Sequence, residues 1–329
     1  MSIRLTNAEI DHLVHRFDIL DLEQWDRGAM ERAAAGLGWR LRSELAEGLT
    51  FIGPLPDGWN FAYRGHVHGS PREGAFTMLE CELARTGETA VLTEVFLAAK
   101  AAAEKRIGPA PIWRGPGPVL RWRRPETLLE IERTGNTVRL RLLPADVAEN
   151  HEYQLAKWGE RDDAVAEIGV WQATTTEGAA LEGVFVPGGH LAGTWDEFGE
   201  WLEETLAALS GAMGPLDQEV VLVMAPVTDR YPGFVQLRCD ARLLHLEAGT
   251  EGLDPRKAAE LGWQQDDAEN LVHVIDFGHP RPSDIEAAAR VLVNTLRVQD
   301  VPLDDLHCTA WLGKGGYSLD LYGLGIPQN

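Results

Sequence analysis

The strongest constraint on the fold is an amphipathic helix with a defined start, which lies beyond the middle of the chain. Thr194 is followed three residues later by Glu197, the spacing of a capping box, in which the two side chains satisfy the first free amides of a helix. The apolar side chains that then recur at helical spacing are Trp195, Phe198, Leu202, Leu206 and Leu209. Gly211 and Gly214-Pro215 end the pattern. Because a helix with one apolar face must bury it, this stretch predicts a layered domain.

The residues after this helix predict an antiparallel sheet. EVVLVMAPV (219–227) and the segment 233–249 are rich in apolar and β-branched residues and are bounded by turn formers, so both read as strands. Asp254-Pro255 predicts a short helix that Gly262 ends. Another strand at 271–277, a helix beginning at a capping box on Ser283, and a closing hairpin within 306–325 complete the series. The order α-β-β-α-β-α-β(β) is typical of an α+β domain.

The first half repeats this plan more loosely. It predicts a helix that begins near Asp21 and carries Trp25 to Leu37, a long Ala-rich helix at 89–107, and three strands at 118–123, 127–133 and 137–144. Both halves contain Leu-Gly-Trp, at 37–39 and 261–263, which reads as a helix C-terminus followed by an aromatic residue that folds back on the core. We therefore expect two tandem modules, each an antiparallel sheet flanked by amphipathic helices, with boundaries at 1–160, a partly ordered linker at 161–190, and 191–329.

Charge and cysteine content limit the class of protein. The net charge of −21 argues against nucleic-acid binding, which needs a basic surface. Residues 1–160 hold 20 Lys and Arg against 23 Asp and Glu, whereas residues 161–329 hold 10 against 28. This asymmetry indicates surfaces with different roles, or simply acidity that favours solubility. No apolar stretch is long enough to span a bilayer, no secretory leader is apparent, and Cys81, Cys239 and Cys308 fit a reducing cytoplasm.

No motif in the sequence predicts catalysis, and we expect no enzyme, no cofactor and no metal. His66 and His68 share a face if extended but have no third ligand nearby. His307 and Cys308 are adjacent and would point to opposite faces of a strand, so they cannot act as a nucleophile and its base. The glycines around Lys314 lack the spacing of a phosphate loop.

The arginines of the first half are its most informative pattern. Arg121 and Arg123 flank Trp122, and Arg139 and Arg141 are likewise two apart, so each pair lies on one face of a strand. Guanidinium groups bind carboxylates and aromatic faces, which makes these residues a candidate contact surface. Two alternatives stay open. The arginines could pair across the strands with Glu126, Glu130 and Glu132, or they could dock onto the acidic second half.

The second half of the chain resembles a known protein family. The aromatic pair Trp195 and Phe198 opening a long helix, the strand FVQL (234–237), and the short helix ending AAELGW (258–263) are similar to the TY-Chap or YbjN-like family, which is related in fold to type III secretion chaperones. The resemblance covers about 190–325. The first half looks like a diverged actinobacterial relative, on the evidence of Leu-Gly-Trp and the strand PVLRW (118–122), and a duplication would account for both halves.

The resemblance implies a chaperone-like protein that binds another protein and has no catalytic residues. We expect a cytoplasmic adaptor whose partner is a secreted effector or toxin, with Trp311 and Tyr317 as exposed aromatic contacts in the second module. An immunity or antitoxin-like protein that neutralises a toxin is the alternative, because acidic inhibitors complement basic nucleases. Both a homodimer and an intramolecular pseudo-dimer fit the tandem arrangement.

Overall fold

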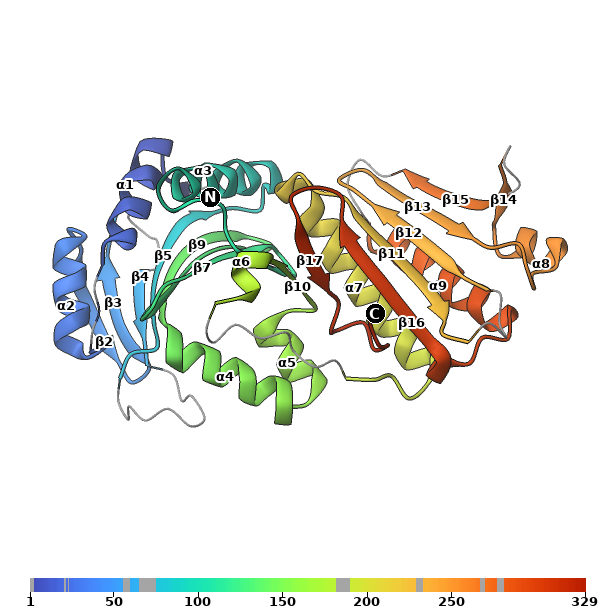
Figure 1. The fold of residues 1–329 in the computed structure, drawn as a ribbon. Coiled ribbons are helices and arrows are strands. Elements are labelled where there is room, and N and C mark those ends of the chain that lie inside the picture. The colour runs from blue at the N-terminus through green and yellow to red at the C-terminus, as the bar shows by residue number, and fades with distance from the viewer. Residues whose placement is uncertain are drawn as a thin grey trace. The chain divides into compact units, whose positions relative to one another are not determined.

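A computed structural model of the chain describes residues 3–20, 22, 24–55, 60–64, 75–181, 190–228, 233–266, 270–276 and 281–329. The chain forms two compact units (Figure 1). Unit 1 comprises Met1–Trp113, Gly117–Gly159 and Glu177–Phe185, and unit 2 comprises Arg114–Pro116, Glu160–Thr176 and Val186–Asn329.

Unit 1 combines one antiparallel sheet with four helices among the residues that the structure describes. Its helices are α1 (Asn7–Asp18), α2 (Arg27–Gly36), α3 (Thr89–Ile107) and α4 (Ala145–Trp158). Its strands are β1 (Ile3–Arg4), β2 (Arg40–Leu45), β3 (Gly48–Ile52), β4 (Asn60–Tyr63), β5 (Met78–Arg85), β7 (Val119–Arg123), β8 (Thr127–Arg133) and β9 (Thr137–Pro144). Two elements, β6 (Ile112–Gly115) and α6 (Thr176–Ala179), contain residues assigned to both units.

The strand order in unit 1 places an apolar face and a charged face on the same sheet. The order is β2-β3-β4-β5-β9-β8-β7, with β1 added at the end of β5, and every pairing is antiparallel. Helix α3 packs against α1 and against β5, β8 and β9, and it buries Leu92, Val95, Phe96 and Ala99. Helix α4 contacts β8 and β9 from the opposite side of the sheet (Figure 1).

Unit 2 follows a different strand order. Its helices are α5 (Arg161–Ile168), α7 (Trp195–Leu216), α8 (Pro255–Glu260) and α9 (Pro282–Val298). Its strands are β10 (Trp171–Thr175), β11 (Val220–Pro226), β12 (Val235–Cys239), β13 (Leu243–Ala248), β14 (Gln264–Gln265), β15 (Leu271–Asp276), β16 (Leu306–Leu312) and β17 (Tyr317–Asp320). The order in the sheet is β10-β17-β16-β11-β12-β13-β15-β14, again antiparallel throughout.

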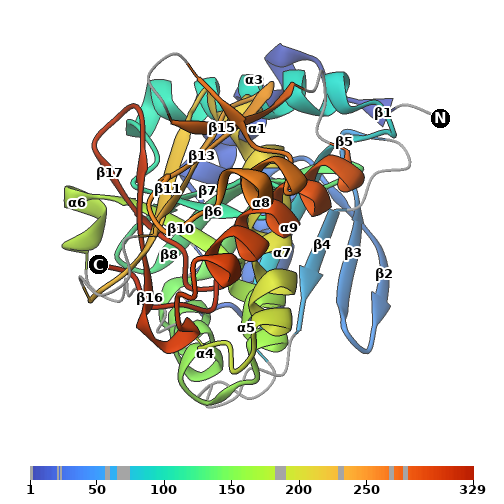
Figure 2. The same ribbon diagram turned by 90° about the vertical axis from the view of Figure 1, so that its right-hand side faces the viewer.

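Helices cover one face of the unit 2 sheet. Helices α7 and α9 pack against each other and contact β12, and α9 also contacts β13. In the view of Figure 1 both lie behind the sheet, and the rotated view in Figure 2 shows α7 and α9 together on that side. Their apolar stripes are fully buried against it, including Phe198, Leu202, Leu206, Leu292 and Leu296. The other face of β11, β12, β13 and β16 carries no described helix of this unit.

The expected α+β class is confirmed, and most of the expected elements exist. The Thr194 hydroxyl accepts a hydrogen bond from the Glu197 amide, as the capping box predicts, and Asp254 caps α8. Three expectations were wrong. Helix α7 continues through Gly211, Gly214 and Pro215 to Leu216, so Gly211 does not end it. Helix α9 begins at Pro282, so Ser283 is not its N-cap, and α2 is capped by Asp26 rather than near Asp21, which lies outside the described residues. Helix α4 was not expected, and the described part of 161–190 forms α5, β10 and α6.

Both Leu-Gly-Trp segments form the same helix-ending motif. The Trp39 amide donates to the Ala34 carbonyl at 2.8 Å, and Gly38 adopts φ 74°, the left-handed conformation that a Schellman motif requires. Gly262 (φ 91°) and Trp263 repeat this arrangement, and both indoles are 5% exposed. The first motif precedes the first strand of its meander, whereas the second follows three strands. The recurrence is therefore explained by the helix ending itself and is not evidence of a duplicated module.

Candidate functional site

The four candidate arginines share one face of the unit 1 sheet. Arg121 on β7 lies opposite Glu130 on β8, which lies opposite Arg141 on β9, which in turn lies opposite Glu80 on β5. Because residues opposite each other in an antiparallel pair project on the same side, this row alternates charge across four strands. The sequence pattern therefore predicted a shared face, and carboxylates of the intervening strand separate the arginines.

The β7 end of this row holds α4 on the sheet. Arg121 donates to Glu130 at 2.6 Å and to both carboxylate oxygens of Glu152 on α4, at 2.6 and 3.0 Å. Arg123 makes a second two-pronged contact with Glu149, one turn earlier on α4, at 3.1 and 3.2 Å. Burial alone would lower the pKa of Arg121, but the charges of Glu152 and Glu130 outweigh it and raise the pKa. Arg121 is thus fixed as a cation, with 5% of its surface exposed.

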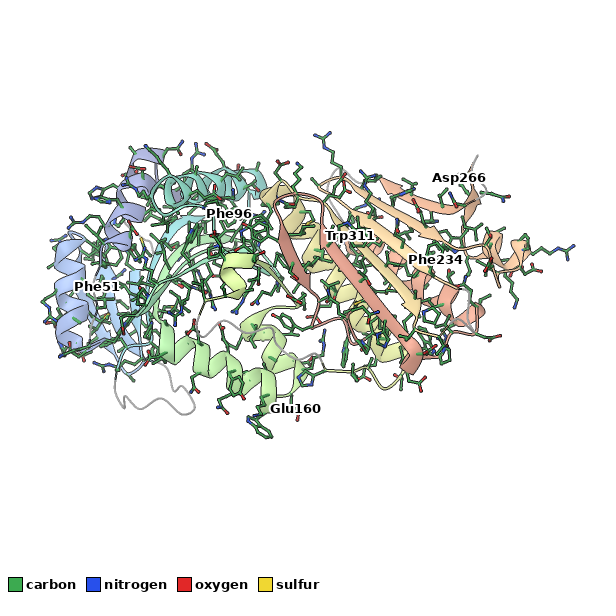
Figure 3. The ribbon with its side chains drawn as sticks, in the orientation of Figure 1. Phe51, Phe96, Glu160, Phe234, Asp266 and Trp311 are labelled. Atoms are coloured by element: carbon green, nitrogen blue, oxygen red, sulfur yellow. The ribbon has the colours of Figure 1, made fainter. Side chains whose placement is uncertain are left out.

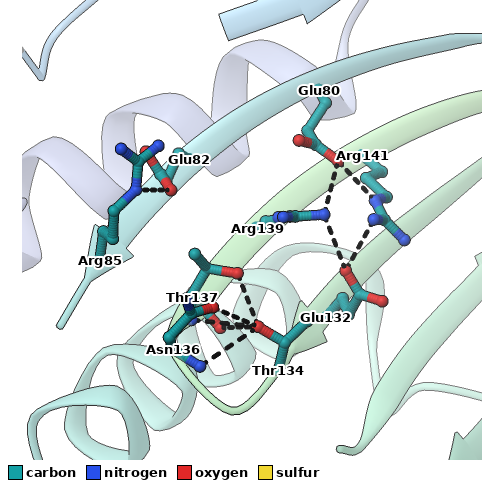
Figure 4. Close-up of polar contacts among 9 residues, drawn as sticks. All are labelled: Glu80, Glu82, Arg85, Glu132, Thr134, Asn136, Thr137, Arg139 and Arg141. Carbon is teal, nitrogen blue, oxygen red and sulfur yellow. Dashed lines mark hydrogen bonds and ion pairs between the residues drawn. The ribbon is translucent and has the colours of Figure 1, made fainter. Parts of the chain in front are cut away.

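The other end of the row is a four-membered ring of charges (Figure 4). Arg141 contacts Glu80 and Glu132 at 2.8 Å each, and Arg139 approaches the same two carboxylates at 3.6 and 3.8 Å. Burial raises the pKa of Glu132, and the charge of Arg141 opposes this rise only in part. Nearby Thr134 accepts the amide of Thr137 and closes the turn between β8 and β9.

The predicted site residues of unit 1 lie on two different faces of its sheet. The alternative in which the arginines pair with carboxylates across the strands describes their observed contacts, with Glu80, Glu149 and Glu152 as further partners that the sequence did not indicate. Trp122 does not join them. It lies on the opposite face, is 4% exposed, and donates its indole N–H to the carbonyl of Gly108 at 2.9 Å. Adjacent residues of a strand point to opposite faces, which is the physical reason.

Strand β11 in unit 2 presents a row of apolar side chains on its open face. Val220, Leu222 and Met224 are fully buried beneath α7 and α9, whereas Val221 and Val223 retain partial exposure. Val227 directly after the strand is 56% exposed. Alternation along the strand therefore leaves a line of Val221, Val223, Ala225 and Val227 without a helix over it.

Two aromatic residues flank this line. Trp311 on β16 lies opposite Val221 and is 43% exposed. Phe234 immediately precedes β12 and is 38% exposed, and its ring lies so close to Gly249 that a Cβ there would come within 2.9 Å of it. Figure 3 shows both aromatics on the side of the sheet turned away from α7 and α9. We name the set Val221, Val223, Ala225, Val227, Trp311 and Phe234 the β11 stripe.

Polar side chains border the β11 stripe on β12 and β13. Arg238 pairs with Glu219 at 2.8 Å, and His245 lies 3.3 Å from Glu247. Tyr317, predicted together with Trp311 as a contact, does not lie on this face. Its neighbour Ser318 is the residue opposite Trp311, so Tyr317 projects from the other side. The structure brings one predicted residue of the second module, Trp311, into the stripe.

The groups that sequence reasoning considered for chemistry are not assembled into a reactive centre in the described part of the chain. Burial raises the pKa of Cys239 and of Cys308 to about 12, so both stay as neutral thiols. No cluster of His, Cys, Asp and Glu among the described residues could hold a metal ion. His66 and His68 lie outside those residues. Within the same described residues, no helix is long and apolar enough to cross a membrane.

Unit 2 therefore has a sheet covered by helices on one face, with an apolar line on the other, and exposed apolar surface is a feature of interaction sites. Residues 188–307 match the model described as T3SS (YopN, CesT) and YbjN peptide-binding chaperone 3, which confirms the resemblance seen in the sequence. Residues 9–143 match a family of unknown function, DUF6301. No curated protein and no solved structure matches the chain.

The β11 stripe was not predicted as a surface. The run EVVLVMAPV is apolar at nearly every position, which is typical of a strand buried on both faces. In an antiparallel sheet with helices on one side, the same run leaves half of its side chains exposed. The signal that could have revealed the surface is that the strands paired with β11 alternate between apolar and polar residues, as in VQLRC of β12.

Proposed function

We propose that this protein is a non-catalytic, chaperone-like binder of another protein in the cytoplasm, and that a segment of the partner docks on the β11 stripe. The match of residues 188–307 to a peptide-binding chaperone family supports the class. The observation that carries the proposal is the exposed apolar line Val221–Val227 in a unit whose other sheet face is covered. Exposed apolar surface that is bordered by polar residues is a feature of protein interaction sites.

The stripe has the composition of an interface core. Tryptophan is enriched among residues that dominate binding energy. Covering the 43% of Trp311 that is exposed removes on the order of 100 Å² from water, which corresponds to about 2–3 kcal/mol. The valines add to this, and the polar border on β12 and β13 supplies hydrogen-bonding groups around the apolar centre.

The absence of catalysis in this proposal is supported by how the reactive residue types are used. The arginines Arg121, Arg123, Arg139 and Arg141 are engaged by carboxylates within unit 1. The thiols Cys239 and Cys308 are buried with raised pKa values. Groups engaged in this way stabilise the fold, and this use agrees with a binding role.

A pair of matched variants tests the proposal. Val223→Lys places a charge at the centre of the stripe, and Ala207→Lys makes the same charge change on an exposed position of α7. Wild type and both variants, confirmed as folded by circular dichroism, are used to capture partners from the source cell. We expect a stoichiometric partner with wild type and Ala207→Lys and its loss with Val223→Lys. Capture of the same partner by Val223→Lys would refute docking on the stripe.

An immunity-like role is the second candidate, and one observation favours it. Residues 161–329 contain 28 Asp and Glu against 10 Lys and Arg, a surplus that complements basic toxins. Activity assays of the captured partner separate the two roles. An immunity protein inhibits its partner stoichiometrically, whereas a chaperone keeps the partner soluble and leaves its activity unchanged after release.

A further inference from the structure

We infer that the segment docked on the β11 stripe is a cationic amphipathic helix of the partner. This inference rests on the proposed function and specifies its partner. It is drawn from the length and width of the stripe, from the pairing of β11, and from the charges around it.

The dimensions of the stripe match one helix. Strands rise about 3.4 Å per residue, so the line from Val221 to Val227 is about 20 Å long. A helix rises 1.5 Å per residue, and about 14 residues cover that distance. At its centre the line is a single strand wide, because the residues opposite Val223 on the two neighbouring strands, Gln236 and Thr309, are polar. One apolar stripe of an amphipathic helix, with residues at i, i+3, i+4 and i+7, has the same narrow form.

An added strand cannot use this site. Strand β11 is paired with β12 along Val220–Met224 and with β16 along Val220–Pro226. Its backbone amides and carbonyls are therefore committed on both edges, and a partner has only the side chains of the open face to contact. Helix-in-groove recognition works through side chains alone, whereas strand addition needs a free edge.

A second copy of the chain is a poor occupant. The stripe alone is smaller than the roughly 800 Å² that a stable dimer interface buries on each copy. A twofold contact would also bring two faces of the same charge together. Residues 161–329 carry 18 more acidic than basic side chains, so repulsion opposes self-association through this unit.

The charges beside the stripe select a basic partner. Glu247 projects from β13 on the open face, two strands from Val223. At the other end, Asp305 accepts the hydroxyl of Thr228 at 2.6 Å and its backbone carbonyl accepts the amide of Val227. The one arginine of this face among the described residues, Arg238, is already paired with Glu219. Lysines or arginines on either side of a helical apolar stripe would therefore meet Glu247, whose contacts are His245 and Gln236, and Asp305, which accepts the Thr228 hydroxyl.

Three synthetic peptides of 18 residues test the inference with the full chain. The first places leucines at i, i+3, i+4 and i+7 with lysines elsewhere, the second scrambles the same residues, and the third replaces each lysine by glutamate. Binding is measured by fluorescence anisotropy to wild type, Val223→Lys and Ala207→Lys. We expect the first peptide to bind wild type and Ala207→Lys at least tenfold more tightly than the other two peptides, and to lose at least tenfold with Val223→Lys.

Each other outcome has a defined meaning. Equal binding of the scrambled peptide, or equal binding to Val223→Lys and Ala207→Lys, overturns the inference. If a captured partner depends on Val223 but its bound region is extended or acidic, the inference fails and the proposed function stands. If light scattering shows a dimer that Val223→Lys dissociates, the occupant is a second copy and the inference fails. If neither peptides nor partners bind the stripe, the proposed function fails as well.

Discussion

Replacing Arg121 by methionine should weaken unit 1 more than any surface substitution. Methionine keeps the apolar stem of the side chain and removes the guanidinium that Glu130 and Glu152 share at 2.6 Å. Both carboxylates then remain in place with 4% and 7% of their surfaces exposed and without this partner. Breaking a buried ion pair from one side costs about 3–5 kcal/mol. That is a large part of the 5–15 kcal/mol by which domains are typically stable.

The loss should appear first in α4. The buried side chains of this helix are Ala145, Val147, Glu149 and Glu152, so few apolar contacts hold it once Arg121 is gone. Hydrogen exchange of the α4 amides, followed by mass spectrometry, reads this helix separately from the rest of the chain. Urea unfolding gives the global change. The matched comparison is Arg123→Met, which breaks the ion pair with Glu149. Because this pair is more exposed than that of Arg121, its loss should lower the free energy of unfolding by less.

A triple replacement makes the reasoning refutable. If the cost of Arg121→Met comes from uncompensated carboxylates, replacing Arg121, Glu130 and Glu152 together by Met, Leu and Leu should restore most of the stability, because apolar residues of similar volume often substitute for buried ion pairs without loss. A triple variant as unstable as Arg121→Met would contradict this account. So would a loss below about 1 kcal/mol for Arg121→Met, since that is the value of an exposed pair.

Three further predictions concern single positions. Gly38→Ala should cost about 1–2 kcal/mol in thermal unfolding, because φ is 74° while no atom lies within 4 Å of the new Cβ, so the backbone alone resists. Burial raises the pKa of Glu132 above 4.5, so the folded protein binds this proton more tightly than the unfolded chain. The stability of wild type relative to Glu132→Gln should therefore be greatest below pH 4.5 and fall as pH rises, as measured by urea unfolding across the acidic range. Trp263→Phe should cost about 1 kcal/mol in urea unfolding, because it removes the hydrogen bond to the buried Thr295 hydroxyl.

Local signals in the sequence predicted local structure well. The Thr194 cap on the Glu197 amide, the Asp254 cap and the helix-ending glycines Gly38 and Gly262 all act within a few residues, and the structure contains each of them. Gly211 and Gly214 do not end a helix and lie within α7. The strands of the first half also appear at the expected ranges, because their apolar periodicity is strong. The shift in the start of α9 has a local reason too. Pro282 is well suited to the first turn of a helix, and it competes with Ser283 for the role of setting the boundary.

These local signals could not predict contacts between residues that are far apart in the sequence. The row of alternating charges depends on β9 pairing with β5, which is separated from it along the chain by α3, β6, β7 and β8. Glu152 lies 31 residues from Arg121, on a helix whose weakly apolar face gave little periodicity to detect. The exposure of β11 depends on where α7 and α9 lie, and no property of β11 itself records that.

The charge distribution of the chain is uneven and fits the proposed recognition of a partner by the second unit. In residues 1–160, 20 basic side chains face 23 acidic ones, and those of the sheet face satisfy one another within unit 1. In residues 161–329, 10 basic side chains face 28 acidic ones, so pairing within this segment leaves at least 18 carboxylates for solvent or for a partner. The β11 stripe lies among the latter, and so does the match to a peptide-binding chaperone family. Electrostatic surplus speeds the encounter with an oppositely charged partner, while an apolar stripe slows dissociation. The second unit combines both features, whereas the arginines on the sheet face of the first unit are paired with carboxylates of that same unit.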